Sequence, residues 1–190
     1  QFSDEYFIEE DKPDWRWEGG FSKNTIDDAE NIRDQNLRAI FGNWSYLKNN
    51  RPNYANRKIT WVAFIGGKRE SRRLMGDHIL NQNDIQNQIK YTDASFTTTW
   101  SLDLHYPDPK NSKYFPGEEF FSYCDQPEII PYHVPYRCLY SRNIENLFMA
   151  GRNISVTHVA FGTIRVQRTT AMMGEVVGMA ASICKSHNAN

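Results

Sequence analysis

The 190-residue sequence predicts an α/β protein with α+β character, in which helices pack against a mixed sheet. Three patterns carry this prediction: a long amphipathic segment near the start, β-branched and aromatic runs in the middle, and a second helix-forming segment at the end. Charged residues make up 24% and hydrophobic residues 39%, which is typical of a globular protein and not of a disordered tail. The longest unbroken apolar run, 61–65, is too short to cross a membrane.

A helix is predicted over residues 26–48. Thr25 precedes it as an N-cap residue, and two aspartates in its first turn suit the positive end of the helix dipole. Pro52 follows as a stop signal. Apolar residues recur at helical spacing on one face: Ile26, Ala29, Leu37, Ile40, Phe41, Trp44 and Leu47. We interpret this helix as a packing element whose aromatic side chains belong to the core.

Strands are predicted in the middle of the chain. Residues 59–65 and 95–105 are rich in β-branched and aromatic residues, and a glycine pair at 66–67 ends the first run. Residues 132–136 are predicted to be extended, because their proline excludes a helix.

The last third of the chain predicts a strand, a polar loop and a helix. Residues 146–151 form a short apolar run that suits a buried parallel strand, and a helix is predicted over 163–185. One face of that helix carries almost no side chains, and we expect it to press against another backbone. The face comprises Ala171, Gly174, Gly178 and Ala181.

Such a strand, loop and helix are typical of a ligand site in α/β proteins. The helix amino end, around Gly162 and Thr163, offers N–H groups to an anion or a flavin carbonyl. Arg152 and Arg165 add positive charge, and His158 is suited to move a proton near neutral pH. Structural ion pairs for the arginines and an ordinary polar contact for the histidine are the alternatives.

Charge and cysteine patterns limit the other function classes. The net charge is −1, which gives no overall case for nucleic acid, although 51–73 holds seven bases against one acid. Three cysteines without a C-x-x-C pair disfavour a disulfide framework or a zinc site. One bridge between Cys124 and Cys138 stays open. The same sparse cysteines fit the periplasm and the cytoplasm equally well, so the compartment stays open too.

Three segments resemble the FAD-dependent oxidoreductase family found in many bacterial polysaccharide-utilising lineages, whose members are sometimes labelled xanthan lyases. The longest is NLFMAGRNISVTHVAFGTIR at 146–165, continued by TTAMMGEVVGMAA at 169–181. WEGG at 17–20, with the helix start at 25–34, fits a second family segment. The run at 61–77, with RESRR at 69–73, resembles the third.

The resemblance implies an architecture and a set of site residues. Residues 1–140 would form a substrate or cap domain, and 141–190 a strand-loop-helix that completes a Rossmann-like FAD domain. By this analogy His158 and Arg165 serve catalysis, while Arg69, Arg72 and Arg73 meet the substrate or hold the domain interface. The positions implied to contact FAD are Ala150, Gly151 and Arg152 along the ribityl and diphosphate groups, and Gly162, Thr163 and Ile164 near the isoalloxazine.

The sequence also departs from the pattern of dinucleotide-binding proteins. No G-x-G-x-x-G occurs in it, and Arg152 stands where many such flavoproteins have an acid. We therefore expect the C-terminal portion of a flavoprotein, cut from a longer chain because it starts at Gln1 and not at Met. The parent would transfer a hydride to FAD from an organic substrate, for which a carbohydrate derivative is one candidate. Without the N-terminal FAD domain as partner, this portion is expected to be inactive and to bind FAD weakly.

Two other function classes are kept as hypotheses. The first is a carbohydrate-active module, either a lyase that acts on an acidic polysaccharide or a sugar-binding domain. Tyr132, His133, Tyr136 and Arg137 would be its base and its charge-neutralising groups, but an extended core segment explains them equally well. The second is an interaction domain without chemistry, which would self-associate through exposed apolar surface.

Overall fold

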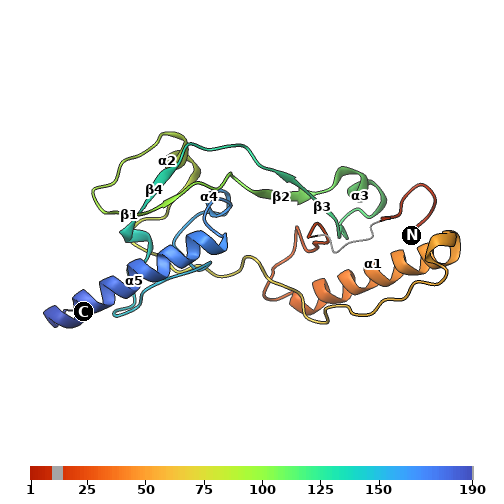
Figure 1. Ribbon diagram of the computed structural model, residues 1–190, viewed down its shortest axis with the longest axis horizontal. Helices are drawn as coiled ribbons and strands as arrows, with labels where there is room; N and C mark the ends of the chain where they lie inside the picture. The colour runs from red at the N-terminus through yellow and green to blue at the C-terminus, as the bar shows by residue number, and fades with distance from the viewer. Residues whose placement is uncertain (10–14, 190) are drawn as a thin grey trace. The chain divides into compact units, whose positions relative to one another are not determined.

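The computed structural model describes residues 1–9 and 15–189 (Figure 1). Helices and two small two-stranded sheets make up its regular structure, which confirms the predicted mixed α/β character. The chain divides into two compact units, which we call unit 1 (1–68 and 105–124) and unit 2 (69–104 and 125–190). The assignment of 1–140 to a substrate domain and of 141–190 to an FAD domain stays a prediction.

Helix α1 (Ala29–Asn50) is the main element of unit 1 and confirms the first predicted helix. Its buried positions, Ala39, Asn43 and Leu47, are spaced four residues apart. The amide of Asn43 accepts from the N–H of Ile8 and donates to its carbonyl, both at 2.8 Å, which fixes the N-terminal segment on the helix. Phe41, expected in the core, is instead 53% exposed, because the buried stripe passes through positions 39, 43 and 47 on another side of the helix.

The core of unit 1 is aromatic. Its buried residues are Tyr6, Ile8, Ala39, Phe120 and Phe121, and Phe2, Trp17, Tyr114 and Phe115 pack against them. The buried Asn111, on α3 (Pro109–Tyr114), accepts from the N–H groups of Phe120 and Phe121 at 2.8 and 3.1 Å and donates to the Tyr6 hydroxyl. This amide satisfies backbone groups that would otherwise be buried without partners. A 3-10 turn, η1 (Pro52–Tyr54), follows α1 at the predicted proline.

Unit 2 is built around an antiparallel pair of strands, β1 (Ala94–Thr98) and β4 (Tyr132–Pro135), with Phe96 opposite Val134. β4 confirms the predicted extended segment over 132–135, whereas Tyr136 already belongs to a 3-10 helix. The strand predicted over 95–105 is divided in two, because residues 99–103 leave the pairing and β2 (Leu104–Pro107) pairs with β3 (Ser122–Asp125). The smaller elements are α2 (Gln82–Gln86), which starts with a capping box, η2 (Tyr136–Cys138) and α4 (His158–Phe161).

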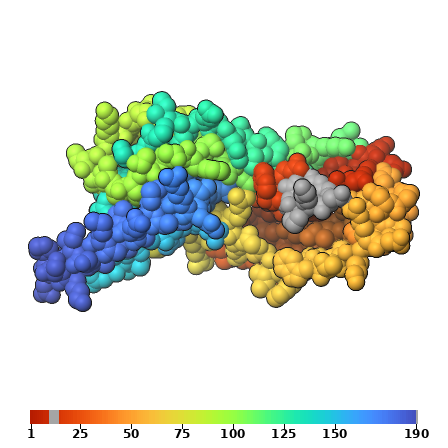
Figure 2. All heavy atoms as spheres, in the orientation of Figure 1, coloured from red at the N-terminus to blue at the C-terminus, as the bar shows by residue number. Residues whose placement is uncertain are grey.

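Helix α5 (Gln167–His187) packs on β1, so the second predicted helix is right in type but begins four residues late. Its buried residues are Thr169 and Met173, and the predicted small face does not pack. A Cβ added at Gly174 or Gly178 would meet no atom within 4 Å. The branched and thioether side chains of α5 pack on the core instead, because their burial removes more apolar area from water. Figure 2 shows the last turns of α5, in dark blue, at the surface.

Residues 59–65 do not form the predicted strand. Trp61 is 77% exposed and Phe64 73% exposed. Strand-forming side chains need a neighbouring strand for their backbone hydrogen bonds, and none of the described strands pairs with this segment.

Residues 146–151 also differ from the predicted parallel strand. They make only a single antiparallel bridge, between Phe148 and Tyr140, and the Met149 N–H donates to Leu139 at 2.7 Å. Asn146 and Gly151, at the two ends, have φ values of 55° and 135°. These turn conformations leave too few extended residues for a longer ladder.

Two further predictions concern the membrane and the thiols. Among the described residues, no helix combines the length and the apolar character of a membrane span. Cys124, Cys138 and Cys184 are free thiols, so the bridge left open between the first two is not formed.

Candidate functional site

The predicted site residues that the structure brings together are His158 and Arg73, and both contact Glu70. His158 Nδ1 lies 2.7 Å from Glu70 Oε2, and the Arg73 guanidinium pairs with the other carboxylate oxygen of Glu70. The Glu70 and Arg73 side chains are about a quarter exposed, whereas the His158 side chain is 66% exposed. The carboxylate is therefore sheltered between its partners while most of the imidazole faces outward.

The electrostatics of this cluster favour an ionised Glu70. Burial raises the pKa of the Glu70 carboxyl, but hydrogen bonds from His158 and Arg73 outweigh burial and hold this pKa below its usual range. An ionised carboxylate can only accept hydrogen bonds, so His158 Nδ1 carries the proton of that contact. The same hydrogen bond raises the pKa of His158, against the opposing effects of burial and of Arg73 and Arg165.

The backbone explains why these distant residues meet. Leu74 donates to the carbonyl of Asn153 at 3.0 Å, and Leu80 and Val156 form a parallel bridge. Residues 74–80 therefore run beside 153–157. The bridge ends at Thr157, the residue before α4, so His158 starts its helix next to the RESRR segment.

Residues 150–152 lie at the same place. Arg152 Nη1 donates to the carbonyl of Arg69 at 3.1 Å, which ties the loop to the residue before Glu70. Ala150 and Arg152 are exposed. Gly151 has a φ of 135°, which glycine adopts readily, and a Cβ there would meet only one atom, 3.7 Å away.

Residues 162–164, predicted to lie near the flavin ring, are enclosed, whereas Arg72 is exposed. Thr163 is fully buried: its hydroxyl lies 2.6 Å from the Tyr132 hydroxyl and its carbonyl accepts from Thr98. Gly162 sits against residue 103, where an added Cβ would lie 2.9 Å from the Asp103 carbonyl oxygen. Ile164 is fully buried as well.

Arg165 forms a structural ion pair. Its guanidinium donates to the carbonyl and to the carboxylate of Asp103, both at 2.9 Å. Both side chains are largely buried, at 12% and 8% exposed. The pair anchors the junction between α4 and α5, and a catalytic role for Arg165 stays a prediction.

Comparison with known protein families adds the deciding observation. The sequence pattern of a family described as FAD dependent oxidoreductase matches residues 3–190. The chain belongs to the FAD-dependent oxidoreductase family. Comparison with curated proteins and with solved structures found no match. The match supports the predicted family and names no lyase activity.

Membership of the FAD-dependent oxidoreductase family raises the question of which residues fit the cofactor. Residues 150–152 fit a cofactor edge, because an open glycine and an exposed guanidinium suit a diphosphate or a polyol. Residues 162–164 present no open surface, and the N–H groups of all three donate to carbonyls one turn back. The isoalloxazine contact implied for them therefore stays a prediction.

Glu70 is the site residue that sequence reasoning missed. It is an acid among bases, since four of the six residues 68–73 are Lys or Arg. A lone carboxylate in a basic run is the available signal, because it has cations to pair with on both sides. Its second partner, 88 positions away, depends on the fold.

Three of the four residues proposed for a lyase have polar partners within the chain. Burial raises the pKa of Tyr132, and its hydroxyl contacts Thr163. His133 Nδ1 lies 2.8 Å from the Thr97 hydroxyl. Arg137 forms a bidentate pair with Asp93 at 3.0 and 3.1 Å. These contacts suit a structural role, and the lyase hypothesis stays a prediction.

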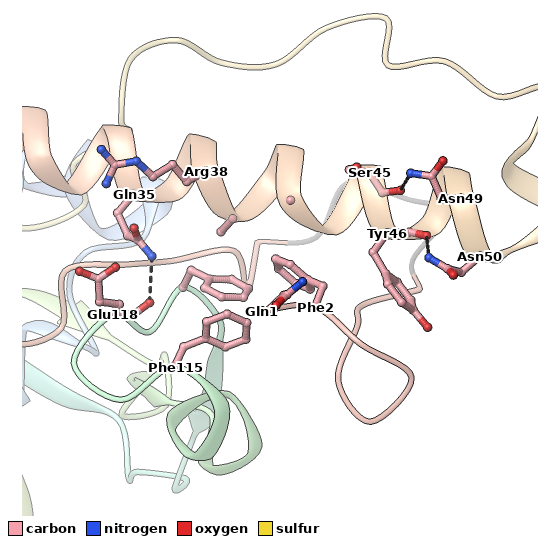
Figure 3. Close-up of a pocket in the computed structure, with 13 residues that line it drawn as sticks. Gln1, Phe2, Gln35, Arg38, Ser45, Tyr46, Asn49, Asn50, Phe115 and Glu118 are labelled. Atoms are coloured by element: carbon pink, nitrogen blue, oxygen red, sulfur yellow. Dashed lines mark hydrogen bonds between the residues drawn. The ribbon is translucent and has the colours of Figure 1, made fainter.

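Unit 1 has a groove of its own along α1, with a volume of about 730 Å³ (Figure 3). The rings of Phe2 and Phe115 form part of its wall, with their centroids 5.3 Å apart, and Gln35 bridges to the Glu118 carbonyl. None of the predicted site residues lines it.

Proposed function

We propose that the chain works in a flavoprotein that oxidises a C–H bond of an organic substrate, and that His158 takes up the proton this releases. The Glu70–His158 hydrogen bond carries the proposal, because a carboxylate-held imidazole that is open on its other side is a common general base. FAD, when bound, supplies the acceptor for the hydride.

The chemistry assigned to His158 follows from its tautomer. In the neutral imidazole, with the proton on Nδ1 directed at Glu70, Nε2 holds a lone pair, and no described residue hydrogen-bonds to it. For a substrate with a CH–OH group, the carbon loses a hydride, the hydroxyl loses its proton to Nε2, and a carbonyl forms. Glu70 stabilises the resulting imidazolium, just as it raises the pKa of His158 in the resting protein.

We also propose that these 190 residues bind FAD weakly by themselves. Two observations support this: the sequence holds no G-x-G-x-x-G motif, and the residues implied to meet the flavin ring are enclosed. Titration of the purified chain with FAD, followed by flavin absorbance, tests it. Weak or undetectable binding is expected, and a stoichiometric, tightly bound yellow complex would contradict it.

The role of His158 is tested by anaerobic flavin reduction in the FAD-loaded flavoprotein in which we propose the chain works, in the presence of a panel of hydroxy compounds. His158→Gln should lower the reduction rate by about 10² to 10⁴, the usual contribution of general base catalysis. His133→Gln is the matched control, because that imidazole also contacts one polar side chain in unit 2. Equal rates for His158→Gln and the native protein would overturn the assignment.

A further inference from the structure

The segment that holds the proposed base is rich in arginine, and we call it, together with Arg152, the arginine-rich face. Residues 69–73 and 152 supply its four arginines: Arg69, Arg72, Arg73 and Arg152. The one acid among these positions is Glu70, and both of its oxygens are engaged, by Arg73 and by His158. This carboxylate therefore already has cationic partners on both sides and is not available to pair with Arg72.

Two hydrogen bonds tie Arg152 and His158 to neighbouring residues of this segment. Arg152 is held on the carbonyl of Arg69, and His158 is held on the side chain of the next residue, Glu70. Arg72, two positions further on, is exposed and forms no hydrogen bond or ion pair with a described residue. The segment 69–73 thus carries both the exposed guanidinium of Arg72 and the Glu70 carboxylate that orients the His158 imidazole.

We infer that the substrate oxidised at His158 carries a carboxylate, which the arginine-rich face binds through Arg72. The inference rests on the proposed function and names its substrate class. A guanidinium presents paired N–H donors whose spacing matches the two oxygens of a carboxylate. A neutral alcohol would gain little from this face, whereas a hydroxy acid or a uronate would be held with its carbinol near Nε2.

The test measures binding without flavin, so that it is independent of the redox proposal. The C2 proton of His158 is followed by NMR, with His158→Gln identifying its resonance among the five histidines. D-glucuronate is titrated into the full chain, and methyl glucoside serves as the uncharged counterpart. The groups known to act on His158 are Glu70, Arg73 and Arg165, so an added anion should raise its pKa further.

Saturable glucuronate binding that moves the His158 resonance, with no response to methyl glucoside, is the expected result. Arg72→Gln should weaken it about tenfold, the equivalent of one charge-assisted hydrogen bond. Lys185→Gln, which removes one positive charge at the far end of α5, should leave it unchanged.

Equal responses to the two sugars, no response to glucuronate, or an unchanged affinity in Arg72→Gln would overturn the inference. A response to pyrophosphate alone would also overturn it, because the face would then serve the cofactor diphosphate. Each of these outcomes leaves flavin reduction untouched, so failure of the carboxylate inference and failure of the redox proposal are told apart.

Discussion

His158 Nδ1 and Glu70 Oε2 lie 2.7 Å apart although 88 positions separate the two residues. The contact joins the first residue of α4 to the basic segment at 69–73, and it fixes which ring nitrogen faces outward. The chemistry that we assign to the chain depends on this one hydrogen bond. The predictions below test it and the packing that positions it.

Replacing Glu70 by glutamine should lower the pKa of His158 toward its ordinary value. The carboxylate raises that pKa in the native protein, and the amide carries no charge to do so. An NMR pH titration of the His158 ring protons measures the change. A pKa that stays the same or rises in Glu70→Gln would show that the carboxylate does not hold the proton.

The same pair makes a contribution to stability whose pH dependence has a definite sign. Because the folded-state pKa of His158 is raised, its contribution is complete below the unfolded-state pKa and is lost as pH rises through the folded-state pKa. Urea denaturation at several pH values should show this decline in the native protein and not in Glu70→Gln. Parallel profiles for the two proteins would contradict it.

Gly162→Ala should destabilise the fold by about 1–3 kcal/mol, the usual cost of overpacking. The new methyl group would lie 2.9 Å from the Asp103 carbonyl oxygen, and backbone moves aside with difficulty. Gly174→Ala is the matched control. That glycine has open space in the middle of α5, so alanine there should stabilise by up to about 1 kcal/mol. If the urea midpoints of both variants shifted in the same direction from that of the native protein, the result would contradict this packing.

Asn111→Ala should destabilise unit 1 by about 2 kcal/mol or more. The substitution leaves the buried N–H groups of Phe120 and Phe121 without their acceptor, and each such loss costs about 1–3 kcal/mol. Asn56→Ala, at an exposed position of the same unit, should change little. Equal free energies of unfolding for the two variants would contradict this role of the Asn111 side chain.

Thiol labelling should separate the three cysteines. Burial raises the pKa of Cys138 to about 12, and the residue is fully buried, so its thiolate is scarce and inaccessible. A disulfide reagent should modify Cys124 and Cys184 in the native protein and reach Cys138 only after unfolding in urea. Rapid labelling at three sites in the native chain, reduced to two in Cys138→Ser, would show that Cys138 is accessible and would contradict its buried position.

The parts of the fold that were predictable from sequence are those with local causes. Helices α1 and α5 follow from apolar spacing and from stop signals such as Pro52, which act within a few residues. Residues 59–65 have the composition of a strand, but a strand also depends on a partner elsewhere. The small face of α5 was misjudged for the same reason, since glycine spacing does not reveal what lies opposite.

The candidate site shows the same difference between local and long-range causes. His158 and Arg73 were predictable as residue types suited to proton transfer and anion binding. Their common partner Glu70 was not, because the hydrogen bond depends on residues 74–80 running beside 153–157. Thr163 and Arg165 look functional in sequence, yet their polar groups satisfy buried contacts to Tyr132 and Asp103.

The pH dependence of anaerobic flavin reduction tests the central claim most directly. In the FAD-loaded flavoprotein, with a saturating hydroxy acid, the rate should rise with pH through the pKa that NMR assigns to His158, because the neutral imidazole is the base. In Glu70→Gln the midpoint should move to lower pH by the same amount as that pKa. A rate that does not change with pH around the His158 pKa, or an unchanged midpoint in Glu70→Gln, would contradict the assignment of His158 as the base.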